Sequence, residues 1–174
     1  MSKINDNKIF MKLIIAFILG ILSFCFGFKK YELEKYAYIE NNSVDYKVYL
    51  KENSYFTEAY LPKDQQYIAS IIDYIDVNYN YIFSSSKNID SVFKYKIVAT
   101  LTASNNVNNQ LKKLWSNDYI LLEETVKNMP DSNSFVINEN VKIDYQEYNN
   151  IINNFKKDYM LSVVSDLKVK LLVE

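Results

Sequence analysis

The chain has 174 residues, with 20 lysines against 21 acidic residues and a net charge of −1. It contains no arginine, no histidine and a single cysteine. Histidine-dependent triads and dyads, imidazole metal sites and arginine clamps are therefore excluded. Heavy use of asparagine, lysine, isoleucine and tyrosine is typical of an AT-rich genome, so we expect the source to be a low-GC bacterium.

An apolar run near the amino terminus predicts a membrane segment. Residues 9–28 carry only Lys12 as a charge, and about 20 residues at ~1.5 Å each span a hydrocarbon core of ~30 Å. We expect residues 1–8 to form a cytoplasmic tail, 9–28 a transmembrane signal anchor in contact with membrane lipid, and 29–43 a juxtamembrane stalk. A cleaved signal peptide and a buried core helix are the alternatives. The bulky residues around Ser23 and Cys25 disfavour cleavage, and the missing polar face disfavours a core helix.

The lysines on the two sides of this run balance, three against three, so they do not settle its orientation. A short basic tail before the first apolar run is nevertheless typical of an export signal whose amino terminus stays inside. We therefore predict a single-pass protein of the cell membrane, with residues 44–174 forming an extracytoplasmic domain.

The part of the chain after the anchor has its own charge and composition. Residues 31–174 hold 20 acids and 15 lysines, a net charge of −5, which predicts no nucleic-acid partner. They contain no glycine, so phosphate-binding glycine loops and nucleophile elbows are excluded, and we expect no cofactor. The lone Cys25 excludes a disulfide within the domain. Turns are expected at polar clusters: Asn41-Asn42-Ser43, Ser84-Ser85-Ser86, Asn105-Asn106 and Pro130-Asp131-Ser132-Asn133.

Between those clusters apolar and polar residues alternate, as in strands with one buried face. The predicted strands are 44–51, 75–83, 93–101 and 167–173, with less regular ones at 119–126 and 135–145. One helix is expected at 145–160, with Asp144 as its N-cap and Glu147 three residues later. Residues 67–74 are ambiguous and favour a strand. The fold class is thus mainly β: an antiparallel sandwich-like domain with one amphipathic helix, preceded by the transmembrane helix.

Three segments carry a resemblance to a known family: Val44 to Phe56, Tyr67 to Tyr81, and Tyr95 to Leu101. Their aromatic and apolar pattern resembles a family of uncharacterised membrane-anchored proteins of low-GC bacteria and archaea, a domain of unknown function. The resemblance implies an amino-terminal transmembrane helix and a β-rich ectodomain, and it carries no catalytic residues. It also implies that members are longer, with a second transmembrane helix. Since the chain stops inside a strand pattern, a truncated reading frame stands beside a native end as an alternative.

The acidic residues offer no convincing catalytic or metal site. Residues 76–80 begin like a calcium loop, but Tyr81 stands where glycine is needed and Lys87 where the bidentate glutamate belongs. A polar strand face is the favoured interpretation. Asp73 and Asp76 form a chance-level carboxylate pair, so a carboxylate hydrolase acting on cell-wall polymer is only a minor alternative. We expect no catalytic, cofactor-binding or metal residues, and no enzyme.

Tyrosine is the strongest anomaly, since 16 tyrosines but only five phenylalanines and one tryptophan follow the anchor. Amphipathic tyrosine suits surfaces that bind proteins and sugars, although half-exposed strand positions in an AT-rich organism would also account for it. The candidate binding surface comprises Tyr46, Tyr49, Tyr79, Tyr81 and Tyr95. The sequence therefore predicts a membrane-anchored extracytoplasmic structural or binding module with a surface or membrane protein as partner. The alternative is an accessory subunit of a membrane export or surface-assembly complex.

Overall fold

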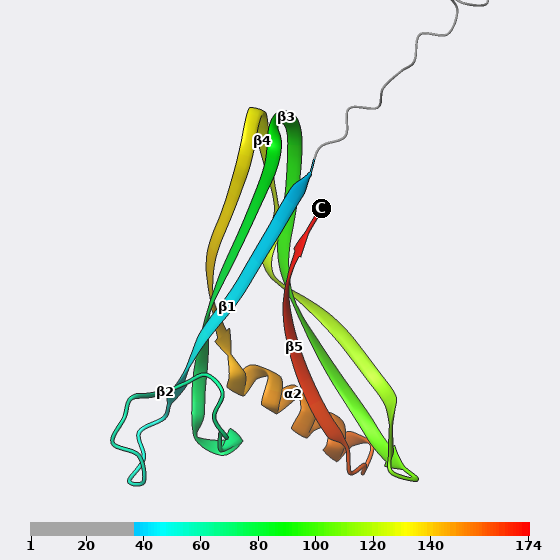
Figure 1. The fold of residues 1–174 in the computed structure, drawn as a ribbon. Helices are drawn as coiled ribbons and strands as arrows, with labels where there is room; N and C mark the ends of the chain where they lie inside the picture. Colours follow the sequence, from blue (N-terminus) through cyan, green and yellow to red (C-terminus); the bar gives the residue numbers. More distant parts are fainter. Residues whose placement is uncertain (1–36) are drawn as a thin grey trace, which may run out of the picture. The chain divides into compact units, whose positions relative to one another are not determined.

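The computed structural model describes residues 37–174, which form an antiparallel β-sheet with one α-helix (Figure 1). In chain order the elements are β1 (Tyr38–Leu50), β2 (Tyr60–Pro62), the 3-10 turn η1 (Ala69–Ile71), β3 (Ile72–Val107), β4 (Gln110–Asp144), α2 (Tyr145–Asp158) and β5 (Val164–Val173). The predicted tail, the anchor at 9–28 and most of the stalk lie outside the described residues. Within 37–174, no helix is long and apolar enough to cross a membrane.

Two very long strands, β3 with 36 residues and β4 with 35, make up most of the domain. They pair with each other as one hairpin, from Tyr74 opposite Asp144 to Val107 opposite Gln110. The turn consists of Asn108 and Asn109, whose φ angles of 53° and 61° are both positive. Asparagine tolerates this left-handed backbone better than most residues, so it replaces the glycine that such two-residue turns ordinarily use.

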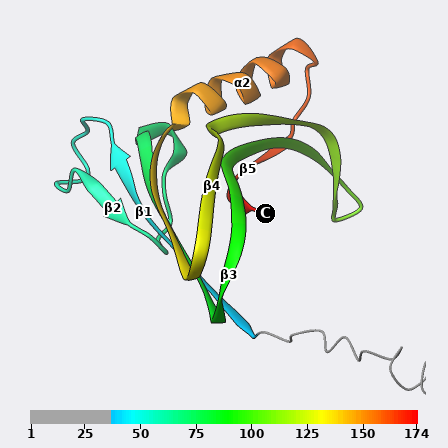
Figure 2. The ribbon, with the colours of Figure 1, turned by 90° about the horizontal axis from the view of Figure 1, so that it is seen from above.

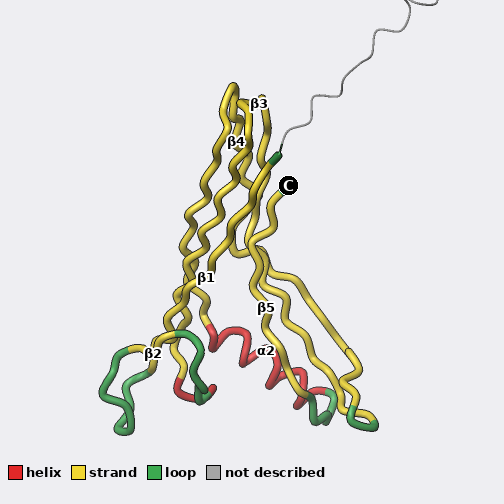
Figure 3. The backbone as a smooth tube through the Cα atoms, in the orientation of Figure 1, coloured by secondary structure: helices red, strands yellow, loops and turns green. Residues whose placement is uncertain are grey.

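This ribbon folds over on itself near its middle (Figures 1 and 3). The pairing register shifts between Ser84 and Ile89 on β3, and the facing segment of β4 contains Asp131, whose φ is 46°. At this bend the backbone N–H of Asp131 in β4 donates a hydrogen bond of 2.9 Å to Asp90 Oδ1 in β3. The predicted turns at 84–86 and 130–133 thus mark a bend in continuous strands, and each strand supplies two of the segments predicted as separate strands.

The bend divides the sheet into two halves that face each other. The β1 half contains β2, β1, residues 72–84 of β3 and 134–144 of β4. The β5 half contains residues 89–107 of β3, 110–132 of β4 and β5. Figure 2 shows the two halves from above, with α2 lying across one end. The predicted class, mainly antiparallel β with one helix, is confirmed.

Alternating side chains from both halves fill the space between them as two core clusters. The larger cluster joins Val77 and Tyr79 of the β1 half to Ile97 and Leu101 of the β5 half. The smaller cluster is aromatic, and Phe93 stacks on Phe135 with ring centroids 4.3 Å apart. Burying one such side chain stabilises the fold by about 1.5–3 kcal/mol, so the facing apolar surfaces hold the two halves together.

The helix α2 covers the larger cluster at the end away from the bend. Its N-cap is Asp144, whose side chain accepts hydrogen bonds from the N–H groups of Gln146 and Glu147, so the predicted helix and cap are confirmed. Tyr148 and Ile152 are its buried residues. Trp115 of β4 stacks on Phe155 of the helix at 5.7 Å.

Two local predictions differ from the structure. Asn41-Asn42-Ser43 lies inside β1, which begins at Tyr38 and pairs with β3 over its whole length, so the predicted turn there is wrong. Asn105-Asn106 is also strand, and the turn lies two residues further on. In both places polar residues occupy outward or edge positions of a strand, which local composition does not distinguish from a turn.

Candidate functional site

The candidate site is a groove between β1 and β5, the two outer strands of the facing halves. Each of these strands pairs with β3 on one side. On the other side β1 pairs with β2 only at Lys47, Val48 and Tyr49, and β5 pairs with no other described strand. Backbone N–H and C=O groups along these two free edges therefore lack a strand partner among residues 37–174.

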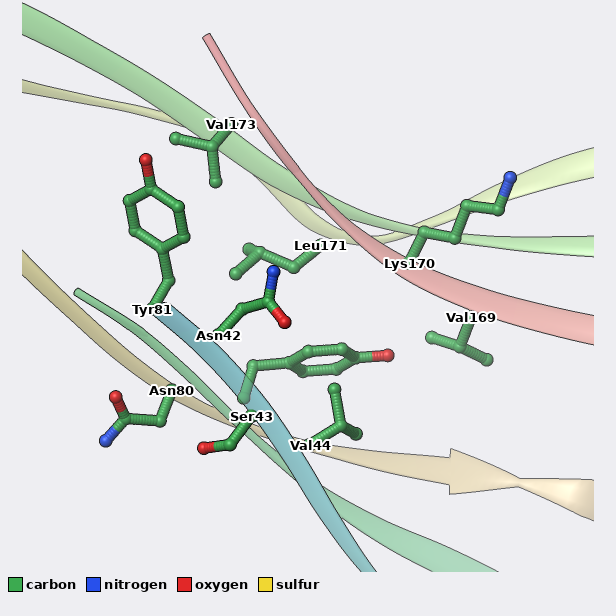
Figure 4. Close-up of a pocket in the computed structure, with 10 residues that line it drawn as sticks. Asn42, Ser43, Val44, Asn80, Tyr81, Val169, Lys170, Leu171 and Val173 are labelled. Atoms are coloured by element: carbon green, nitrogen blue, oxygen red, sulfur yellow. The ribbon is translucent and has the colours of Figure 1, made fainter. Parts of the chain in front are cut away.

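Two adjoining cavities make up the groove. The first, of about 330 Å³, lies between Asn42 and Tyr81 on one wall and Leu171 and Val173 on the other (Figure 4). The second, of about 340 Å³, extends toward Val48, Ile75 and Tyr67. The two cavities share three lining residues: Val44, Tyr79 and Val169. Because they share these walls, the cavities form one continuous apolar groove with polar side chains gathered at one end.

Two tyrosine hydroxyls, one at the groove and one in the core beside it, donate hydrogen bonds to glutamate carboxylates. Tyr81 donates to Glu40 Oε1 at 3.0 Å, and Tyr95 donates to Glu139 Oε1 at 2.8 Å. Burial, followed by the hydrogen bond and negative charge of Glu40, raises the pKa of Tyr81 to about 12. Burial also raises the pKa values of Tyr79 and Tyr95. These phenols therefore stay neutral near pH 7, which suits packing and hydrogen bonding rather than nucleophilic chemistry.

The structure separates the five predicted tyrosines. Tyr79 and Tyr81 line the first cavity, and Tyr46 joins Tyr79 at the second. Their exposed fractions differ, with Tyr46 half-buried while Tyr79 is 4% and Tyr81 7% exposed. Tyr95 is 4% exposed in the aromatic cluster, and Tyr49 lies on the opposite face of β1. The structure therefore brings three of them to the groove, as partly or fully buried walls.

Sequence reasoning missed the β5 wall and Tyr67 as parts of the site. Tyr67 lines the second cavity, and its ring centroid lies 6.4 Å from that of Tyr46. The Tyr67 hydroxyl donates to the carbonyl oxygen of Pro62 at 2.5 Å. The alternation of apolar residues at 167–173 gave the only signal for the β5 wall, since it marks Leu167, Val169 and Leu171 as one face.

The acidic pairs considered from the sequence are not assembled into a site. Asp73 lies at a register shift at the start of β3, where Tyr49 pairs with Tyr74 and Leu50 with Ile72, whereas Asp76 pairs with Lys47 in the regular ladder. Asp76, Asn78 and Asn80 share one outer face, as a strand requires. Among residues 37–174, no cluster of three or more acidic or cysteine side chains has the arrangement to hold a metal ion.

Comparison of the chain with protein-family models, with curated proteins and with solved structures finds no match. The family resemblance drawn from the aromatic segments therefore stays a prediction, and the groove is the feature from which a function can be argued.

Proposed function

We propose that the protein is a membrane-anchored extracytoplasmic binding module that holds an extended segment of a surface or membrane protein in the groove between β1 and β5. The apolar run at 9–28 and the basic tail before it support the membrane location. The open groove is the single observation that carries the binding role.

The groove suits an extended polypeptide for two reasons. Its two rims are strand edges, whose unpaired backbone groups can hydrogen-bond to a strand laid between them. Its walls are apolar, since Val44, Val169 and Leu171 line them. They can accommodate the alternate apolar side chains of such a strand. Backbone hydrogen bonds to the strand edges supply the affinity, and the shape of the apolar groove supplies the sequence specificity.

Site-specific photo-crosslinking in cells tests this function. A photoreactive residue replaces Val44, which lines both cavities and is 46% exposed, in the full-length chain. The matched control places it at Asn41, an exposed residue of the same strand that projects from the other face. We expect an adduct at position 44 only, mapped by mass spectrometry to an alternating apolar segment of one partner protein. Equal adducts at both positions, no adduct, or adducts with lipid alone would contradict the proposal.

The runner-up role, an accessory subunit of a membrane export or surface-assembly complex, uses the same groove. The two roles differ in stoichiometry, because a subunit stays bound in a fixed ratio while a module exchanges its partner. Purification in mild detergent separates them: a constant molar ratio of the crosslinked partner through two chromatographic steps favours the subunit.

A further inference from the structure

The outer face of the β1 half carries an ordered array of nine hydrogen-bonding side chains, seven of which lie outside the lining of the groove. Cross-strand register places these residues in three adjacent rows over β1, β3 and β4: Ser43, Asn80 and Asn138; Asp45, Asn78 and Asn140; and Lys47, Asp76 and Lys142. We call these nine residues the asparagine face. Since side chains alternate along a strand, the asparagine face projects away from the core, and Ser43 and Asn80 at one end of it also border the first cavity of the groove.

The amides of this face retain most of their hydrogen-bonding capacity. The one hydrogen bond between them within the described residues runs from Asn78 Nδ2 to Asn138 Oδ1, at 3.3 Å. Asn78, Asn138 and Asn140 are exposed. Each side-chain amide offers two donors and an acceptor to a ligand. A depression of about 230 Å³ is sunk into the middle of the face, lined by Asp45, Lys47, Asp76, Asn78 and Asn140 together with Tyr46.

An aromatic row borders the array at the end next to β2, where Tyr49 of β1 pairs with Tyr60 of β2. Tyr49 and Tyr74 stack with centroids 4.4 Å apart, and Tyr60 of β2 lies 5.5 Å from Tyr49. Lys142 Nζ lies 3.6 Å from the Tyr74 ring centroid, and Lys47 Nζ lies 4.8 Å from that of Tyr60. Tyr60 is 41% exposed, so its ring offers an apolar surface beside the polar rows.

The charges of the face balance one another. Among its nine residues, Lys47 and Lys142 offset Asp45 and Asp76, and the two lysines flank Asp76 in a single row. A balanced face gives no net attraction to a polyanion such as nucleic acid or acidic polymer. None of its nine side chains is apolar, so the face itself offers no surface that suits a hydrophobic protein partner. The complementary ligand is neutral, long enough to cross several strands, and rich in groups that both donate and accept hydrogen bonds.

We propose that the asparagine face binds a neutral glycan chain, with one sugar unit in the depression and an adjacent unit against Tyr60. Vicinal hydroxyls match the donor and acceptor atoms of the Asn78 and Asn140 amides and the acceptor oxygens of Asp45, and the apolar face of a sugar ring matches an exposed tyrosine ring. The depression is smaller than the ~300 Å³ at which pockets for whole small molecules begin, so the ligand extends along the face. This inference goes beyond the proposed binding of a protein segment, since it concerns the other face of β1.

Calorimetric titration of the full-length chain tests this proposal, in a detergent that has no sugar head group. The probes are neutral hexasaccharides of glucose, mannose or N-acetylglucosamine, and a hexamer of galacturonic acid. The test variant is Asn78→Ala with Asn140→Ala. The control is Asn153→Ala with Asn154→Ala, which removes two exposed asparagines of α2.

We expect at least one neutral hexasaccharide to bind. The test variant should weaken it by about tenfold or more, because it removes the hydrogen bonds of two side-chain amides, whereas the control should not. Tyr60→Ala should weaken it as well. Binding of galacturonate alone, binding of no neutral probe, or equal binding by the test and control variants would overturn the proposal.

Discussion

At the scale of single residues, two isoleucines of the same hairpin differ sharply in burial. Ile97 of β3 is 0% exposed within the larger core cluster, whereas Ile120 of β4 is 57% exposed. The two lie near each other on the same hairpin, since Ile120 pairs with Val98, the residue after Ile97. Period-two alternation assigns Ile97 to the core, but the unbroken apolar run from Tyr119 to Leu122 gives no such assignment for Ile120 from the sequence alone.

We therefore predict opposite outcomes for the same substitution at these two sites. Ile97→Ala should lower the free energy of unfolding by about 2–5 kcal/mol, because it removes buried methyl groups and leaves a cavity. Ile120→Ala should change it by no more than ~0.5 kcal/mol. Urea unfolding followed by the fluorescence of Trp115 measures both values. Similar losses for the two variants would contradict the assigned packing.

The raised pKa of Tyr81 predicts that the folding stability depends on pH in the alkaline range. Its pKa rises from 10.0 to about 12 in the folded state, chiefly through burial and then through the bond to Glu40. Between these values the unfolded chain has lost a proton that the folded chain retains, so stability is full below pH ~10 and falls as pH rises through ~12. Tyr81→Phe should make this fall shallower, and urea unfolding at a series of pH values measures it. An unchanged slope would contradict the assignment.

At the scale of elements, the hairpin turn depends on two asparagines with left-handed backbone. Asn109, at a φ of 61°, should accept glycine with no loss of stability, whereas valine should cost about 1–2 kcal/mol because its branched Cβ clashes there. Asn106 is the control, since it is an extended strand residue where valine is favourable. Thermal unfolding of Asn109→Gly, Asn109→Val and Asn106→Val separates these effects. Equal tolerance of valine at both positions would contradict the turn.

The helix cap gives a second prediction at this scale. Asp144→Ala should cost about 0.5–2 kcal/mol, because the N–H groups of Gln146 and Glu147 lose their acceptor. Asp158→Ala, at the other end of α2, should be neutral or slightly stabilising, since an acidic side chain there opposes the helix dipole. Circular dichroism during urea unfolding reports both changes. A loss from Asp158→Ala as large as that from Asp144→Ala would contradict the capping role.

Local patterns predicted the strand class, the helix and its cap because these depend on spacing within a few residues. The alternation at 75–83 and 93–101 identifies buried faces correctly, yet it cannot show that both segments belong to one strand that bends between them. The groove was beyond such reasoning, since it arises where β1 and β5, more than 110 residues apart, come to face each other. The asparagines of the outer face were recognised as a polar strand face, but not as rows across three strands.

At the scale of the whole molecule, the folded ribbon produces two distinct surfaces. Folding at 84–91 brings the halves together around the core and leaves β1 and β5 with free edges beside an apolar groove. The same strand β1 presents hydrogen-bonding side chains on its other face. One proposed ligand is an extended protein segment and the other a neutral glycan chain, and both are expected outside the cytoplasm. The central claim is therefore the location of residues 37–174.

Protease protection in whole cells tests that claim most directly. The full-length chain is expressed with a carboxyl-terminal tag, and cells with an opened outer barrier but an intact membrane are treated with protease beside a tagged cytosolic control. The account predicts that the tag on this protein is removed while the cytosolic control survives. A tag that is protected until the membrane itself is dissolved would place the domain in the cytosol and contradict the account.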